Sequence, residues 1–506
     1  MLIKSFSAAL YGIEAYVVEV EVDIGGGLPA YIVVGLPDAS VRESQQRVKA
    51  ALKNCGYEFP SRKVTVNLAP ADRRKEGSAF DLPIALGHLA FLGIVDPAEF
   101  QDFLVLGELA LDGRLKPIKG VLSAALLAKA GGYRGIVVPK DNEREAALVD
   151  GLAVYGLSNL VQVVELLTEP GSIAPSAPAL DEILSTPLPD VDFREVKGQF
   201  HVKRALEVAA AGGHNILLIG PPGSGKTMLA RRLPSILPDM TFEEMIGVTQ
   251  VYSAAGYLRG QGAIVRRPFR SPHHTISDAG LIGGGMVPRP GEVSLAHHGV
   301  LFLDELPEFN RKVLESLRQP VEDGQVTIAR ASMTATFPSA FMLVAAMNPC
   351  ADVLKGLARR DDDCTEAERS KYYSKISGPL LDRIDIQIEV PAVKVQDIVS
   401  RSEGESSMSI RERVVRARKI QLARFAARRI FANAQMGPRE VKAFCRIGAE
   451  GERLLEAALT KLGFSARAYD RSLKVARTIA DLAGEEDINS AHLSEAIQYR
   501  AMDRYY

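Results

Sequence analysis

The sequence predicts a mixed α/β fold whose centre is a parallel β-sheet, with an α+β region before it and a helical region after it. Three apolar runs are typical of the buried central strands of a parallel sheet, at residues 215–219, 300–303 and 341–347. Before residue 167, short stretches rich in β-branched and aromatic residues alternate with segments of helical spacing. A chain of 506 residues is too long for one hydrophobic core, so we expect two to four domains.

The composition and the charge argue against several classes of protein. The 61 basic and 62 acidic residues almost cancel, so any contact with nucleic acid or membrane must come from a local patch. No apolar run approaches the roughly 20 residues of a membrane span, and the N-terminus lacks the apolar core of a signal sequence. The four cysteines are too few and too scattered for a disulfide framework. We therefore expect a cytoplasmic protein without a membrane partner.

The pattern of residues 1–167 predicts an α+β domain. A helix is expected over residues 81–92, and a hairpin is expected around Asp112 and Gly113. Residues 168–189 contain several prolines among small residues, which indicates a linker. Strands are expected where β-branched and aromatic residues are dense, at residues 15–22, 31–34 and 64–68.

The most specific motif is a glycine-rich loop between the first apolar run and a helical segment. Its glycines allow backbone N–H groups to turn toward a polyphosphate, and the helix N-terminus adds a partial positive charge. Lys226 is placed to reach the β- and γ-phosphates, and Thr227 is placed to offer its hydroxyl to Mg²⁺. The motif therefore predicts a site for ATP and Mg²⁺. Its residues are Gly220, Pro221, Pro222, Gly223, Ser224, Gly225, Lys226 and Thr227.

Acidic and amide side chains follow the other two apolar runs. Asp304 is expected to hold Mg²⁺, and Glu305 is expected to polarise the attacking water. Asn348 has the placement of a residue that orients water beside the γ-phosphate, although an asparagine before a proline also suits a plain turn. Because the phosphate loop lies in the same chain, the sequence favours the catalytic interpretation for all three.

The predicted nucleotide-binding core covers residues 190–395. It contains an insertion at about residues 245–295, because the stretch from Thr227 to Asp304 exceeds one strand–helix crossover. Basic residues in and near the insertion suit contacts with DNA phosphates and bases, although a subunit interface or a solvated loop also explains them. The candidates are Arg266, Arg267 and Arg270, and Arg330 near the tip of a predicted hairpin.

Residues 396–506 are expected to form a helical lid domain. Just before it, Arg383 follows an apolar pair and has aspartates on both sides. In an oligomeric ATPase such an arginine reaches the γ-phosphate bound to a neighbouring subunit, although a structural ion pair also fits. Arg467 opens a predicted helix and is the candidate for sensing the nucleotide in its own subunit, with Arg471 as the alternative.

These motifs together resemble one family along essentially the whole chain. The sequence is similar to magnesium-chelatase-like AAA+ proteins of the ComM/YifB type. The resemblance implies a P-loop AAA+ core, an N-terminal domain like the proteolytic domain of Lon proteases (a ribosomal S5 domain 2-like fold) and a C-terminal helical lid. It also implies a homo-hexamer that couples ATP hydrolysis to movement on single-stranded or branched DNA, as a branch-migration helicase in recombination and in the integration of transforming DNA. The motifs that carry it lie at residues 107–118, 220–227, 270–274, 300–306, 347–350 and 377–385.

The Lon-like stretch departs from its family at both catalytic positions. The resemblance sets Ala79 where the serine nucleophile belongs and Leu122 where the lysine base belongs. Ser78 lies one residue from the nucleophile position, but without the lysine its hydroxyl has no activating base. We therefore expect a proteolytically inactive domain that serves binding or assembly.

A second departure concerns zinc. Many members of the family have four cysteines after the sensor asparagine, whereas this sequence keeps Cys350 and Cys364 and has Asp352 and Asp362 at the other two places. Two thiolates and two carboxylates are zinc ligand types, but structural zinc sites strongly prefer Cys and His. Loss of the site is the simpler interpretation, so we expect no zinc.

Other functions stay open. One alternative is the motor subunit of a magnesium chelatase, which shares the ATPase core but does not usually have a Lon-like domain before it. Another is an AAA+ remodeller or regulator that acts on protein. Stimulation of the ATPase by DNA or by protein discriminates between the translocase and the remodeller.

Overall fold

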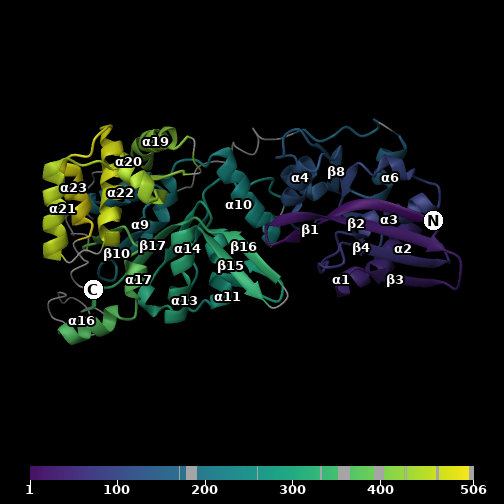
Figure 1. Ribbon diagram of the computed structural model, residues 1–506, viewed down its shortest axis with the longest axis horizontal. Helices are drawn as coiled ribbons and strands as arrows, with labels where there is room; N and C mark the ends of the chain where they lie inside the picture. The colour runs from purple at the N-terminus through teal and green to yellow at the C-terminus, as the bar shows by residue number, and fades with distance from the viewer. Residues whose placement is uncertain are drawn as a thin grey trace. The chain divides into compact units, whose positions relative to one another are not determined.

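The computed structural model describes residues 1–169, 171–177, 191–258, 260–330, 333–350, 365–392, 404–426, 428, 430–462 and 466–500. The chain divides into two compact units, and Figure 1 labels many of their helices and strands. The N-terminal unit comprises Met1–Thr186, Phe242–Val265 and Ala329–Phe337. The core unit comprises Pro187–Thr241, Arg266–Ile328 and Pro338–Tyr506.

A seven-stranded sheet in the order β3-β4-β2-β1-β5-β8-β9 forms the frame of the N-terminal unit (Figure 1). β1 and β2 form a long antiparallel pair, whereas β5, β8 and β9 run parallel. The strands predicted before residue 69 are confirmed as β2, β3 and β4. The bounds are β1 Leu2–Tyr11, β2 Glu14–Gly25, β3 Ala30–Val34, β4 Lys63–Ala69, β5 Phe103–Val105, β8 Gly135–Pro139 and β9 Ala153–Leu157.

Helices cover this sheet. Helix α3 packs against β1 and β2 and is buried along nearly its whole length, because most of its residues are apolar. The predicted hairpin at Asp112 is confirmed as β6 (Glu108–Leu109) and β7 (Leu115–Lys116). The helix bounds are α1 Ala39–Arg42, α2 Ser44–Asn54, α3 Asp81–Phe91, α4 Val121–Ala130, α5 Glu143–Ala146, α6 Leu160–Thr168 and α10 Phe242–Ala255.

The core unit contains the predicted parallel sheet, in the order β11-β14-β17-β10-β18. All four neighbouring pairs are parallel, and every residue of β10, β14 and β17 is buried. The carboxyl ends of parallel strands meet at one edge of a sheet, so the residues after these strands come together. The bounds are β10 Ile216–Ile219, β11 Phe269–Arg270, β14 Val300–Leu303, β17 Met342–Met347 and β18 Ile386–Glu389.

Helices before and after the sheet complete the core unit. α8 (Phe200–Gly212) leads into β10, and α9 (Lys226–Arg232) follows the glycine-rich loop. The C-terminal region is helical, as predicted. Its helices are α19 Ser407–Arg424, α20 Pro438–Phe444, α21 Ala449–Leu462, α22 Ala466–Ala483 and α23 Ser490–Gln498. Shorter elements of the unit are α11 Asp278–Leu281, α12 Glu292–Leu295, β12 Gly283–Gly284, β13 Arg289–Pro290, α13 Arg311–Ser316, α14 Arg318–Asp323, α16 Glu366–Tyr373 and α17 Gly378–Leu381.

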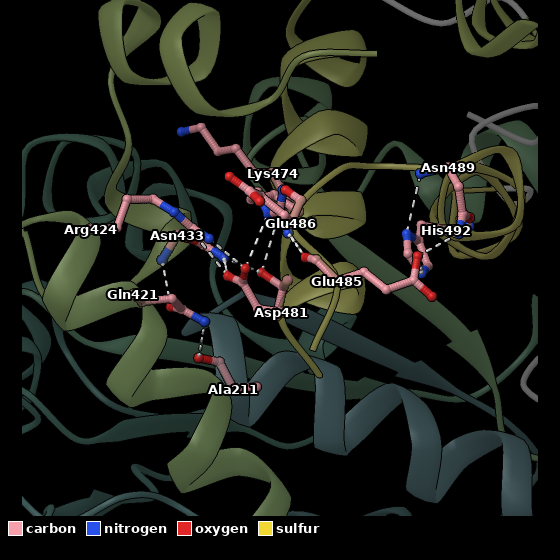
Figure 2. Close-up of polar contacts among 12 residues, drawn as sticks. Ala211, Gln421, Arg424, Asn433, Lys474, Asp481, Glu485, Glu486, Asn489 and His492 are labelled. Carbon is pink, nitrogen blue, oxygen red and sulfur yellow. Dashed lines mark hydrogen bonds and ion pairs between the residues drawn. The ribbon is translucent and has the colours of Figure 1, made fainter. Parts of the chain in front are cut away.

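A buried carboxylate, Asp481 on α22, joins three segments of the C-terminal region, as Figure 2 shows. Arg424 of α19 donates to it at 2.8 and 2.5 Å, and Arg477 donates from the preceding turn of α22 at 3.1 Å. The side-chain amide of Asn433 donates to it at 2.8 Å. We call these four residues the Asp481 cluster.

The C-terminal end of α8 is capped by side chains of α19. Gln421 donates to the Ala211 carbonyl at 3.1 Å (Figure 2), and Arg418 donates to the carbonyls of Ala210 and Ala211 at 3.0 and 3.1 Å. The last carbonyls of a helix have no partner within it, so these bonds satisfy groups that would otherwise be buried without one. They hold α19 to the helix that leads into the phosphate loop.

The predicted domain boundaries stay predictions. Residue 170 and residues 178–189 of the predicted linker, and residues 393–395 at the predicted end of the core, lie outside the described residues. Among the helices that are described, none is long and apolar enough to cross a membrane. The fold class is confirmed: a mixed α/β protein with a central parallel sheet and a helical C-terminal region.

Candidate nucleotide-binding site

The glycine-rich loop follows β10 directly and ends where α9 begins, at Lys226. A Cβ at Gly220 would collide with the Val390 carbonyl oxygen, so the first glycine allows close approach of the segment after β18. Gly225 has φ +90°, a conformation that L side chains rarely adopt. The loop therefore wraps tightly around the N-terminus of α9, where backbone N–H groups and the helix dipole favour an anion.

The Lys226 ammonium lies inside this loop and is largely buried. Its Nζ donates to the carbonyl oxygens of Gly220 and Pro221 at 2.6 and 2.9 Å. It also donates to Oδ1 of Asn348, which follows β17, at 3.0 Å. The structure therefore brings together the predicted phosphate-binding lysine and the predicted sensor from two neighbouring strands.

A hydroxyl and a carboxylate meet at the next position around the loop. Thr227 Oγ1 donates to Asp304 Oδ2 at 2.6 Å, and the other oxygen of Asp304 accepts from the Glu305 amide at 3.0 Å. Mg²⁺ prefers oxygen ligands and commonly retains waters beside one or two protein groups. Thr227 and Asp304 therefore fit a magnesium site, with the Asp304 carboxylate held at the end of β14.

Glu305 has an unusual backbone conformation. Its φ is +53°, in the left-handed region, which costs a non-glycine residue on the order of 1 kcal/mol. Its half-exposed carboxylate lies 3.3 Å from Nδ1 of His274, measured from Oε2. His274 follows β11, the neighbour of β14, so the parallel order of the sheet explains why these two residues meet.

Sequence reasoning did not identify two residues at this site. One is His274, which only the adjacency of β11 and β14 in the folded sheet places near Glu305. The other is Gln199, at the N-terminus of α8 with φ +52°. Its Nε2 donates to the carbonyls of Ser224 and Pro391 at 2.9 Å each, so it ties the phosphate loop to α8.

Arg383 and Arg467 converge on one acidic residue, Glu322 of α14. Arg383 is buried, donates to the Pro379 carbonyl at 2.6 Å and forms an ion pair with Glu322. Arg467 is exposed and lies 3.8 Å from the same carboxylate. Burial, followed by the charges of nearby arginines, lowers the pKa of Arg383. The roles predicted for Arg383 and Arg467 at the γ-phosphate stay predictions.

The alternative sensor, Arg471, binds groups within the protein. It donates to the Arg383 carbonyl at 2.7 Å and forms an ion pair with Asp385. Asp385 is buried, and its pKa is lowered although burial alone would raise it, because Arg471 and His214 favour the charged form. These contacts fix the end of α17 against α22.

The arginines that are candidates for contact with DNA differ in the bonds that their guanidinium groups form within the protein. Arg267 donates to the carbonyls of Pro238, Asp239 and His298 at 2.7, 3.1 and 2.8 Å. Arg270 forms a bidentate ion pair with Glu292 at 2.6 and 2.7 Å. DNA would have to replace these internal bonds.

The other two candidates are Arg330 and Arg266. Arg330 is exposed at the end of β15 (Gln325–Arg330), which pairs with β16 (Met333–Pro338), and Arg266 is partly buried. DNA contact by all four stays a prediction.

Of the four residues considered as zinc ligands, Cys350 is among those that the structure describes. Cys350 is buried after β17, but Asp352, Asp362 and Cys364 lie outside the described residues. Within the described part of the chain, no group of three or more His, Cys, Asp and Glu side chains is placed to hold a metal. The expectation therefore stays a prediction.

The Lon-like positions contain no serine–lysine pair. Leu122 is fully buried in the first turn of α4, and the Ser78 hydroxyl donates to the carboxylate of Glu108 instead of facing a lysine. A carboxylate partner of this kind satisfies the hydroxyl, but Leu122 supplies no amine to act as a base. The geometry agrees with the expectation of a proteolytically inactive domain, which itself stays a prediction.

Comparisons with known proteins show the family of this chain. Residues 192–398 match the family described as magnesium chelatase, subunit ChlI; residues 20–142 match the subunit ChlI of Mg-chelatase, and residues 404–500 match the ChlI C-terminal region. The competence protein ComM of Haemophilus influenzae is 44% identical, over 99% of this chain and 97% of the relative. The uncharacterized protein YifB of Escherichia coli is also 44% identical, over 98% of this chain and 96% of the relative. A shorter match, 30% identical, joins 29% of this chain to 28% of Lon protease 2 of Bacillus subtilis. The chain belongs to the ComM/YifB family of magnesium-chelatase-like AAA+ proteins.

Proposed function

We propose that this protein is an ATP-driven motor that acts on DNA, a homo-hexameric translocase or branch-migration helicase of DNA recombination. The observation that carries the proposal is the meeting of Lys226, Thr227, Asp304 and Asn348 at the carboxyl edge of one parallel sheet. These residues combine a cation for the phosphates with an oxygen pair for Mg²⁺. The Haemophilus influenzae relative is named a competence protein, and this name supports a role of the chain in competence.

The proposed chemistry is phosphoryl transfer from ATP to water. Such transfer depends mainly on positioning and on neutralising negative charge. Lys226 and the backbone N–H groups of the loop bind the β- and γ-phosphates, while Thr227 and Asp304 hold the metal. Mg²⁺, held by Thr227 and Asp304, would supply positive charge that neutralises the negative charge of the phosphates. Glu305 polarises the attacking water, and Asn348 orients it from beside Lys226.

Two arginines complete the proposed mechanism. Arg383 acts on the γ-phosphate of the adjacent subunit, and Arg467 responds to the nucleotide in its own subunit. The two arginines share one carboxylate partner, Glu322, so their guanidinium groups lie beside one another and can respond together. A site divided between two subunits makes hydrolysis depend on assembly of the ring.

Arg330 is the strongest candidate for contact with DNA. Its side chain is exposed, whereas the guanidinium groups of Arg267 and Arg270 already have carbonyl and carboxylate partners. An exposed arginine at a hairpin end suits phosphate contact, which is largely independent of base sequence. We expect Arg330→Ala to weaken DNA-stimulated hydrolysis and leave hydrolysis without DNA unchanged.

One experiment tests the whole proposal. ATP hydrolysis by the purified chain is measured with single-stranded, duplex and branched DNA over a range of protein concentrations, together with particle images in the presence and absence of ATP. The proposal expects hydrolysis that rises with assembly and with DNA. Full-rate hydrolysis by a dilute monomer that is indifferent to every DNA would overturn it.

The alternatives have distinct signatures in the same design. Stimulation by unfolded protein and not by DNA would favour a remodeller. A motor subunit of a magnesium chelatase is favoured by the descriptions of the matching families, and it would insert magnesium into a porphyrin when combined with the other chelatase subunits. Hydrolysis that responds to neither DNA nor protein, but supports metal insertion, would select that alternative.

A further inference from the structure

One part of the nucleotide-binding sequence does not fold with the core unit. The segment Phe242–Val265, which we call the arm, belongs to the N-terminal unit although it lies between the phosphate loop and Asp304 in sequence. Most of the arm is helix α10, which packs against α4 (Figure 1). Its apolar residues Met245, Val248 and Val251 are almost fully buried. The arm is therefore an integral part of the N-terminal unit's packing.

Polar contacts fix α10 at the start of α4. The backbone amide of Gly120, the residue before α4, donates to the Ser253 carbonyl at 3.1 Å. Gln250 donates to the Ser123 hydroxyl at 3.5 Å, and that hydroxyl donates to the Ile13 carbonyl at 2.5 Å. These contacts surround Leu122, the position at which the family resemblance would place a proteolytic lysine. In this protein, α10 packs against that end of α4.

A buried carboxylate lies at the same junction. Glu145 is 3% exposed and accepts from the Asn142 side chain at 2.6 Å. Burial raises the pKa of Glu145, while the neighbouring Ser253 hydroxyl, the Asn142 amide and the Leu122 backbone amide favour its charged form. Ser253 of α10 is thus one of the polar groups beside this buried acid, and its backbone carbonyl is held by the Gly120 amide at the start of α4. Loss of the Ser253 hydroxyl would leave less polar compensation for Glu145.

The two ends of the arm are fastened inside the core unit. Arg267, just after the arm, donates to the carbonyls of Pro238 and Asp239, just before it. The same guanidinium donates to the carbonyl of His298, and the Val300 amide at the start of β14 donates to the Pro268 carbonyl at 2.7 Å. The base of the arm is thus joined to the strand whose other end carries Asp304 and Glu305.

We propose that the N-terminal unit is an intramolecular partner of the ATPase. The unit binds the arm through α4 and Glu145, and it thereby couples its own conformation to the nucleotide state of the core. The unit that resembles a protease then works as an anchor. A nucleotide-dependent shift of β14 or of residues 233–241 reaches the arm through its fastened base, and the arm delivers that shift to α4. This inference rests on the proposed ATP binding but not on any action on DNA.

Two variants of the full-length chain separate docking from folding. Ser253→Glu sets a second carboxylate against the buried Glu145, and glutamate is a good helix former, so α10 itself is retained. Phe242→Glu introduces the same charge at an exposed position in the first turn of α10 and is the matched control. Adding Glu145→Gln to Ser253→Glu removes the repulsion and is the rescue variant.

Amide hydrogen exchange of the α4 and α10 peptides is the readout, with and without Mg²⁺ and a non-hydrolysable ATP analogue. Without nucleotide, we expect Ser253→Glu to speed exchange at the start of α4 and along α10 by about tenfold, since local opening follows local stability. Phe242→Glu should behave as the unmodified chain, and the rescue variant should recover most of the protection. Saturating nucleotide should change exchange at α4 in the unmodified chain and in Phe242→Glu, but not in Ser253→Glu.

Separate results overturn the inference and the proposed function. If nucleotide saturates the core by direct titration and α4 exchange does not change, the contact is structural only and the inference is wrong. If Ser253→Glu leaves exchange at α4 and α10 unaltered, the arm is not gripped at Glu145. If no nucleotide binds at all, the inference and the proposed function are both wrong. The other two results contradict the inference alone.

Discussion

Removal of the Asp481 carboxylate is expected to destabilise the C-terminal helices strongly. The Asp481 side chain is fully buried and the Arg477 side chain is 3% exposed, so Asp481→Ala leaves a guanidinium in the interior without its counter-charge. Arg424, 13% exposed, loses the same partner, and Asn433 loses an acceptor. Breaking a buried ion pair by removing one partner typically costs about 3–5 kcal/mol. We expect a loss in that range for the unfolding of the region that contains α19 and α22.

The assay is urea denaturation of the full chain followed by circular dichroism, with hydrogen exchange of the α22 peptide to identify the transition that moves. Asp487→Ala, an exposed aspartate a few residues beyond α22, is the matched control, and its effect should stay within about 0.5 kcal/mol. Asp481→Asn keeps the volume and an acceptor but removes the charge, so its loss should lie between the two. If Asp481→Ala cost no more than Asp487→Ala, the buried pairing described here would be refuted.

Three further predictions concern the site and the N-terminal unit. Lys226→Ala should abolish nucleotide-dependent hydrolysis, measured as phosphate release, because no other side chain of the loop carries a positive charge; undiminished hydrolysis would contradict the assignment. Arg383→Ala should retain binding of a fluorescent ATP analogue but lower turnover of the assembled protein by about 10³-fold or more, as for other arginine fingers, and normal turnover would remove its role. Burial lowers the pKa of His88 below its ordinary value of 6.5, so its contribution to stability is complete above pH 6.5 and is lost as pH falls toward the folded-state pKa. His88→Phe should therefore flatten the fall in stability between pH 7 and pH 5, measured by urea denaturation, and an unchanged slope would count against this source.

The central strands and the loop were predictable because their signals are local. A fully apolar run predicts a buried strand, and the polar residue that follows it, Asp304 or Asn348, indicates where that strand ends. The parallel order of the sheet then brings these ends together, as the bonds of Lys226 and Thr227 show. No pairing had to be known in advance, because parallel strands share one carboxyl edge.

Contacts between distant segments gave no such signal. Met245, Val248 and Val251 have helical spacing that predicts a buried face, but spacing does not say which surface buries it, and we expected an insertion within the core. The structure packs this face in the N-terminal unit instead. The contact of His274 with Glu305 was likewise invisible, because the place of the two-residue strand β11 in the sheet cannot be read from its own composition.

Helix α8 gives a physical reason for expecting the C-terminal helices and the phosphate loop to move together. Its N-terminal Gln199 binds the Ser224 carbonyl inside the loop, and its C-terminal carbonyl at Ala211 accepts bonds from Arg418 and Gln421 of α19. A helix of 13 residues transmits displacement along its axis with little bending, because each turn is held by its own hydrogen bonds. A shift of α19 must therefore either break the buried caps of Ala211 or carry α8, and with it the loop. Breaking them would leave buried carbonyls without partners, at a cost of about 1–3 kcal/mol each, so concerted movement is the less costly course.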